Sequence, residues 1–104
     1  MAQRIVLYWR DIPAQVIIRD GRKSEKRELP ERFIQAIDTC AMRTGAKDSN
    51  AYLGEWRRGA AEPCSGNLAA EADRAFRELD ELFDPERLNT LLANGGFAKV
   101  GGED

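Results

Sequence analysis

The pattern of apolar residues changes once along this chain, near Pro30, and that change constrains the fold more than any other feature. Before it, apolar residues come in the short continuous runs Ile5–Trp9 and Val16–Ile18, which are typical of buried β-strands. After it, apolar residues recur every three or four positions, as in amphipathic helices. Strands first and helices afterwards predict an α+β domain, with helices packed on one face of a sheet.

Residues 3–29 predict a three-stranded antiparallel sheet. The first strand is Ile5–Trp9 and the second covers Ala14–Arg19. Asp20-Gly21 follows and favours a tight turn, because these residue types tolerate positive φ. The returning segment, Arg22–Leu29, is almost entirely charged, so it fits only at a sheet edge or on an exposed face.

Residues 30–94 predict about four helices. Pro30 suits the first turn of the first helix, and Gly45 suits its end. A short helix with Asp48 or Ser49 as its cap follows. Its expected buried residues are Tyr52, Leu53 and Trp56, and the expected stripe of the first helix is Phe33, Ile34, Ile37, Cys40 and Ala41.

The longest expected helix begins after Asn67 as its cap, and Asp84-Pro85 ends it and starts the last helix before Gly95-Gly96. The small-residue segment Gly59–Gly66 between the second and third helices predicts a mobile loop. The expected apolar stripes are Leu68, Ala72, Ala75, Phe76, Leu79, Leu82 and Phe83, then Leu88, Leu91 and Leu92.

The length of 104 residues fits a single domain, expected over residues 1–96 with a flexible tail over 97–104. The N-terminal apolar run is too short for export or for crossing a bilayer, so we expect a cytoplasmic protein. Cys40 and Cys64 lack the CxxC spacing of redox and metal motifs and are expected to be free thiols. Cys40 lies on a helical stripe and should be buried, and Cys64 should be more exposed.

The sequence contains no histidine, which excludes Ser-His-Asp triads, Cys-His dyads and HExxH zinc sites within this chain. Gly21-Arg22-Lys23-Ser24 lacks the spaced glycine and following apolar helix of a phosphate-binding loop. The carboxylates at one helix end, Glu78, Asp80, Glu81 and Asp84, are interpreted as a solvated surface. We therefore expect a non-enzymatic protein with no catalytic residue, metal site or cofactor.

Charge is unevenly distributed along the chain. Residues 1–60 contain 12 Lys and Arg against 8 Asp and Glu, whereas residues 61–104 contain 4 against 10. This asymmetry fits either two faces with different partners or oppositely charged segments packed together. The net charge of −2 argues against a dedicated nucleic-acid binder.

A basic hairpin leaves weak RNA binding as an alternative. Its cationic residues are Arg19, Arg22, Lys23, Lys26 and Arg27. Asp20, Glu25 and Glu28 interleave with them, so the segment largely neutralises itself. A solvated edge strand explains the same residues.

Two clusters of aromatic and arginine residues are the best candidates for an interaction site. They are Tyr8-Trp9-Arg10-Asp11 and Trp56-Arg57-Arg58. Trp and Arg dominate the energetics of protein interfaces. The same residues also suit a core Trp covered by the stem of an Arg side chain, and this structural interpretation is the more common one for such clusters.

Several of these motifs, in this order, resemble a small bacterial domain family named virulence factor. The matching segments are Tyr8–Val16 (YWRDIPAQV), Lys26–Phe33 (KRELPERF), Ala36-Ile37-Asp38, Tyr52-Leu53 and Trp56-Arg57. A related domain ends conserved virulence factor C, a HEAT-repeat scaffold protein, so the resemblance implies an accessory domain that docks on a larger protein. It implies no catalytic residues. The alternative that it suggests is an accessory subunit of a folate- and corrinoid-dependent methyl-transfer system.

Overall fold

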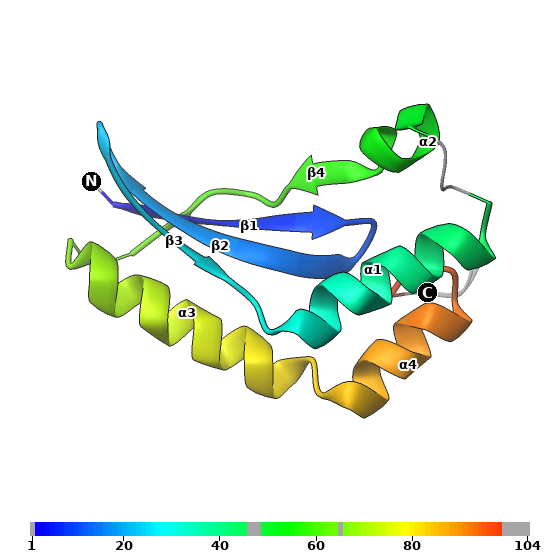
Figure 1. Cartoon of the computed structure of the whole chain (residues 1–104). Helices are drawn as coiled ribbons and strands as arrows, with labels where there is room; N and C mark the ends of the chain where they lie inside the picture. The colour runs from blue at the N-terminus through cyan, green and yellow to red at the C-terminus, as the bar shows by residue number, and fades with distance from the viewer. Residues whose placement is uncertain (1, 46–48, 65, 99–104) are drawn as a thin grey trace.

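The computed structural model describes residues 2–45, 49–64 and 66–98, and it confirms the α+β class (Figure 1). No helix in this part of the chain is long and apolar enough to cross a membrane. The elements of the described ranges are β1 (Gln3–Trp9), β2 (Ile12–Asp20), β3 (Lys23–Glu28), α1 (Glu31–Arg43), α2 (Ser49–Gly54), β4 (Trp56–Arg58), β5 (Glu62–Pro63), α3 (Leu68–Leu82) and α4 (Pro85–Ala93).

The sheet is antiparallel, with the strand order β3–β2–β1–β4 and with β5 also paired to β1. The polar third strand is confirmed as β3, at one edge of the sheet. The expectation of only three strands is wrong, because β4 and β5 extend the sheet along β1. These strands are three and two residues long, which is too short for an alternation of apolar residues to predict them from the sequence. Backbone pairing with β1 is what makes them strands.

The extra strands change two further predictions. Trp56 belongs to β4 and not to the short helix, which ends at Gly54. Leu53 was expected to be buried but is 64% exposed, whereas Tyr52 packs against the core. The expected loop Gly59–Gly66 contains β5, and the Gly59 N–H donates to the Val6 carbonyl at 2.8 Å; residue 65 lies outside the described residues.

The strand register assigns side chains to two faces of the sheet, because successive residues of a strand point to opposite faces. On the first face, arginines reach α3: Arg27 Nε lies 3.0 Å from Asp73 Oδ1, and Arg4 Nη1 lies 3.0 Å from Glu78 Oε1. Helix α3 therefore packs on this face. Its cross-strand rows are Val6–Val16–Arg27 and Arg4–Ile18–Glu25.

The opposite surface, here called the far face, has three alternate rows. They are Arg58–Leu7–Gln15–Glu28, Ile5–Ile17–Lys26 and Gln3–Arg19–Ser24. Figure 1 shows α1, α3 and α4 as one layer on the same side of the sheet, while α2 lies apart from it near β4. The expectation that all the helices share one face is thus wrong for α2.

The core lies between the sheet and the helix layer. Phe33 of α1 meets Phe83 edge-on, with ring centroids 6.3 Å apart. Ile34 and Leu82, expected in buried stripes, are 40% and 56% exposed, because Ile34 lies just outside the arc that α1 buries and Leu82 is the last residue of α3. The largest fully buried side chains are Trp9, Phe33, Ile12, Ile18, Ile37, Val16, Pro13 and Cys40.

Local signals at the element ends are confirmed. The Asn67 side chain accepts a hydrogen bond from the Ala70 N–H, and Asp84 accepts one from the Arg87 N–H. Gly21 has φ +63° in the turn between β2 and β3, and Gly45 has φ +77° after α1. The expected cap of the short helix, at Asp48 or the Ser49 side chain, lies outside what the structure describes.

Candidate docking surface

Strands β1 and β4 bring the two aromatic and arginine clusters side by side. Their antiparallel register pairs Leu7 with Arg58, Tyr8 with Arg57 and Trp9 with Trp56. Residues 47 to 51 positions apart in the sequence thus form one continuous region. The burial of its members, however, differs sharply.

Trp9 belongs to the core. Its exposed fraction is 0%, and its indole Nε1–H donates to the Tyr52 carbonyl at 2.9 Å. The Trp9 and Tyr52 ring centroids lie 5.8 Å apart, and Trp56 meets Tyr52 edge-on at 5.9 Å. Trp9 therefore offers no surface to a partner, and it anchors α2 to the end of the sheet.

Arg10 joins three segments from a mostly buried position. Its backbone has φ +55°, and its Nη1 donates to the Gly95 carbonyl at 2.6 Å. Its guanidinium lies 4.9 Å from the Trp9 ring centroid, 5.0 Å from that of Phe97, and 3.4 Å from the Glu55 carboxylate. This contact set fixes the segment after α4 against the turn between β1 and β2.

Asp11 and Arg57 complete this contact at the surface. Arg57 Nη2 lies 2.8 Å from Asp11 Oδ1, and the Arg57 guanidinium lies 4.5 Å from the Tyr8 ring centroid. Asp11 also accepts a hydrogen bond from the Ala98 N–H at 2.7 Å. Of the expected tail 97–104, residues 99–104 lie outside the described residues, and Phe97 and Ala98 make these contacts.

Trp56 instead borders a groove on the far face. The groove has a volume of about 470 Å³ and lies where the row Leu7–Gln15–Glu28 meets the first turns of α1. We call it the Trp56 groove, and its lining residues are Leu7, Ala14, Gln15, Glu28, Leu29, Glu31, Ile34 and Trp56. Ile34 and Trp56 supply apolar walls from α1 and β4.

The two carboxylates of the Trp56 groove, Glu28 and Glu31, form no ion pair within the described ranges, and on the helices Glu81 and Glu86 form none either. Glu25, Glu55, Glu62, Glu71 and Glu78 each lie within 4 Å of an arginine. The Glu31 side chain accepts a hydrogen bond from neutral Gln35. The groove thus combines apolar walls with a negative rim.

Sequence reasoning missed most of this groove. Only Trp56 was singled out, because the other lining residues come from separate segments that alone resemble ordinary strand or helix positions. One signal was present in Ile34, which extends the apolar stripe of α1 beyond the arc that a helix buries.

The residues of the basic hairpin do not converge on one surface. Arg27 points toward α3, and the hydrogen bonds that its guanidinium donates to Glu25 and then to Asp73 raise its pKa. Arg19 and Lys26 belong to far-face rows, and Arg22 and Lys23 lie exposed at the turn. The array lacks an exposed aromatic platform of the kind that single-stranded RNA sites use.

The thiols and carboxylates form no reactive constellation in the described part of the chain. Both cysteines are free; Cys40 is buried, as expected, and Cys64 is half-buried. Burial raises the pKa of each thiol, and Glu71 raises that of Cys64 further. Within the described residues no group of three His, Cys, Asp or Glu is placed to hold a metal ion.

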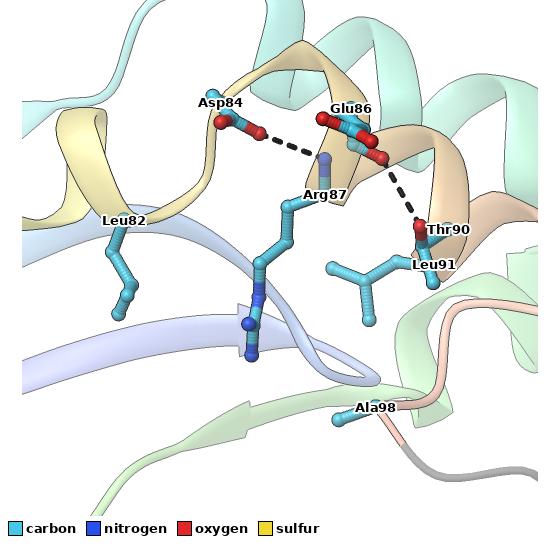
Figure 2. A pocket seen from close by; sticks show the side chains of 7 residues that line it. All are labelled: Leu82, Asp84, Glu86, Arg87, Thr90, Leu91 and Ala98. Carbon is cyan, nitrogen blue, oxygen red and sulfur yellow. Dashed lines mark hydrogen bonds between the residues drawn. The ribbon is translucent and has the colours of Figure 1, made fainter.

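A second recess, of about 440 Å³, lies beside the joint between α3 and α4 (Figure 2). Its polar groups serve the helix: Asp84 caps α4, and the Thr90 hydroxyl donates to the Glu86 carbonyl. The Arg87 guanidinium lies 5.2 Å from the Phe83 ring centroid. These contacts give the recess a structural role.

The family model described as "Virulence factor" matches residues 7–92, from β1 to α4. This chain belongs to the virulence factor family. The matched range contains both aromatic and arginine clusters and all residues of the Trp56 groove. No curated protein and no solved structure matches the chain.

Proposed function

We propose that this virulence factor domain is a non-enzymatic accessory domain that docks on a larger protein through the Trp56 groove. The observation that carries the proposal is the groove itself, in which half-buried Trp56 and 40%-exposed Ile34 lie beside Leu7. Apolar recesses with aromatic walls are where protein interfaces concentrate their binding energy. The free thiols support a reducing, cytoplasmic setting.

The residues of the two aromatic and arginine clusters do not all have the same role in this proposal. Trp9 and Arg10 hold the fold together, and Tyr8, Asp11 and Arg57 form a half-exposed contact beside them. Trp56 and Arg58 remain for a partner, because Trp56 lines the groove and Arg58 extends the row that contains Leu7.

The test is a comparison of partner capture by matched variants. Ile34→Asp places a charge in the groove, and Met42→Asp places the same charge on α1 at a residue that is 69% exposed and outside the groove. Tagged wild-type and variant chains are expressed in the native host, and co-purifying proteins are quantified by mass spectrometry. We expect a partner set retained by Met42→Asp and lost by Ile34→Asp.

Two results of this comparison test the docking function and its alternative. Equal capture by both variants, with folds verified by circular dichroism, would refute docking through this groove. A methyl-transfer protein in the set that Ile34→Asp loses would support the alternative role as an accessory subunit of one-carbon transfer.

A further inference from the structure

We infer that the occupant of the Trp56 groove is a positively charged segment of a partner protein, which inserts an apolar side chain and places a Lys or Arg against Glu28 and Glu31. This inference rests on the proposed docking function and specifies the chemistry of the partner. It follows from the dimensions, walls and charges of the groove.

The dimensions fit a short extended segment. The groove extends from Glu28 on β3 to Trp56 on β4, which is three interstrand spacings or about 14 Å. About four residues of extended chain span that distance. A volume of about 470 Å³ lies within the usual range of binding pockets, so one or two side chains fill the groove.

The walls call for an apolar anchor. Leu7 and Ala14 come from the sheet, and Ile34 and Trp56 face them from α1 and β4. Exposed large apolar side chains gain most from contact with another apolar side chain. Trp56 is also suited to the stem of a Lys or Arg.

The charges determine which polar residue accompanies that anchor. Elsewhere on the sheet, Glu25 pairs with Arg27 and Glu62 pairs with Arg4. Glu28 and Glu31 flank Leu29-Pro30 at the mouth of the groove, and no cationic side chain in the described ranges pairs with either. The helix dipole explains an acidic residue in the first turn of α1 at Glu31, but it does not explain Glu28.

The experiment is a selection with random 12-residue peptides displayed on phage. The library is first depleted on the Ile34→Asp variant and then selected on the wild-type full chain at low salt. We expect enriched peptides to combine a large apolar residue with Lys or Arg within four positions. Synthetic versions of these peptides should bind the Glu28→Gln/Glu31→Gln variant with an affinity at least about fivefold lower than their affinity for the wild-type chain. Their affinity for the wild-type chain should also fall at high salt.

A matched control variant removes the same number of negative charges at a place outside the groove. Glu81→Gln/Glu86→Gln alters net charge equally at exposed residues of α3 and α4, and it should leave peptide binding unchanged. Groove-dependent peptides that are acidic or uncharged, or that bind the Glu28→Gln/Glu31→Gln variant equally well, would overturn the basic-segment inference and leave docking standing.

Two other outcomes would overturn the inference that a basic segment occupies the groove. If no peptide depends on Ile34, both the inference and the proposed docking function are overturned. Concentration-dependent self-association of the full chain that Ile34→Asp abolishes would assign the groove to a second copy and would overturn the inference.

Discussion

The two tryptophans should respond very differently to truncation, and Trp9→Ala is the more informative change. Trp9 is completely buried, and its indole satisfies the Tyr52 carbonyl. A buried Trp removes about 200 Å² from water, which at about 25 cal/mol per Å² corresponds to about 5 kcal/mol. Large-to-small substitutions of buried aromatic residues cost about 3–5 kcal/mol. We therefore expect Trp9→Ala to lower the free energy of unfolding by about 4 kcal/mol.

The assay is urea unfolding followed by far-UV circular dichroism, which does not depend on the fluorescence of the residue removed. With an m-value of about 2 kcal/mol/M for a domain of this size, the midpoint should fall by about 2 M. Trp56→Ala, at a half-buried residue, should cost about 1–2 kcal/mol. Equal losses for the two variants, or a Trp9→Ala loss below about 1 kcal/mol, would refute the assignment of Trp9 to the core.

Three further predictions concern the end of the chain and the thiols. Gly96→Ala should destabilise the fold by about 1–3 kcal/mol in the same assay, because Gly96 has φ +89°, which strains a residue with a side chain. A Cβ at this position would also lie 3.0 Å from Cys40 Sγ and 3.1 Å from Arg10 Cδ. An unchanged urea midpoint would contradict this packing. Cys64 should react with a thiol reagent in the native state while buried Cys40 reacts only after unfolding, and simultaneous labelling in a mass-spectrometric time course would disprove the burial of Cys40. Burial raises the pKa of Cys40 above its usual 9.0, so the unfolded chain loses the thiol proton at a lower pH than the folded chain does. The free energy of unfolding should therefore fall as pH rises from about 9 toward the raised pKa. Cys40→Ala should show a shallower fall, and an identical slope for the two chains would contradict the raised pKa.

Local features of the fold were predictable because their causes lie within a few residues. The turn at Asp20-Gly21 and the caps Asn67 and Asp84 depend on side chains that interact with adjacent backbone. The apolar stripe of α1 follows from the helical repeat alone. These signals establish the order of strands and helices.

Tertiary contacts determine the rest, and no local pattern reports them. Strand β4 forms because its backbone pairs with β1, with Arg57 opposite Tyr8, and no three-residue segment predicts that pairing. Trp9 and Trp56 have similar neighbours in the sequence, yet one lies in the core and the other borders a groove. The groove itself arises only when Glu31 and Ile34 of α1 come beside Leu7 and Trp56 of the sheet.

Site-specific photocrosslinking in living cells tests the central claim most directly. A photoreactive amino acid at Gln15, on the floor of the Trp56 groove, is compared with one at Arg77, an exposed residue of α3 outside the groove. We predict a discrete protein adduct from position 15 that disappears when Ile34→Asp is added, and no such adduct from position 77. The absence of an adduct at position 15, or the same adduct from both positions, would contradict the claim that this domain works through the groove.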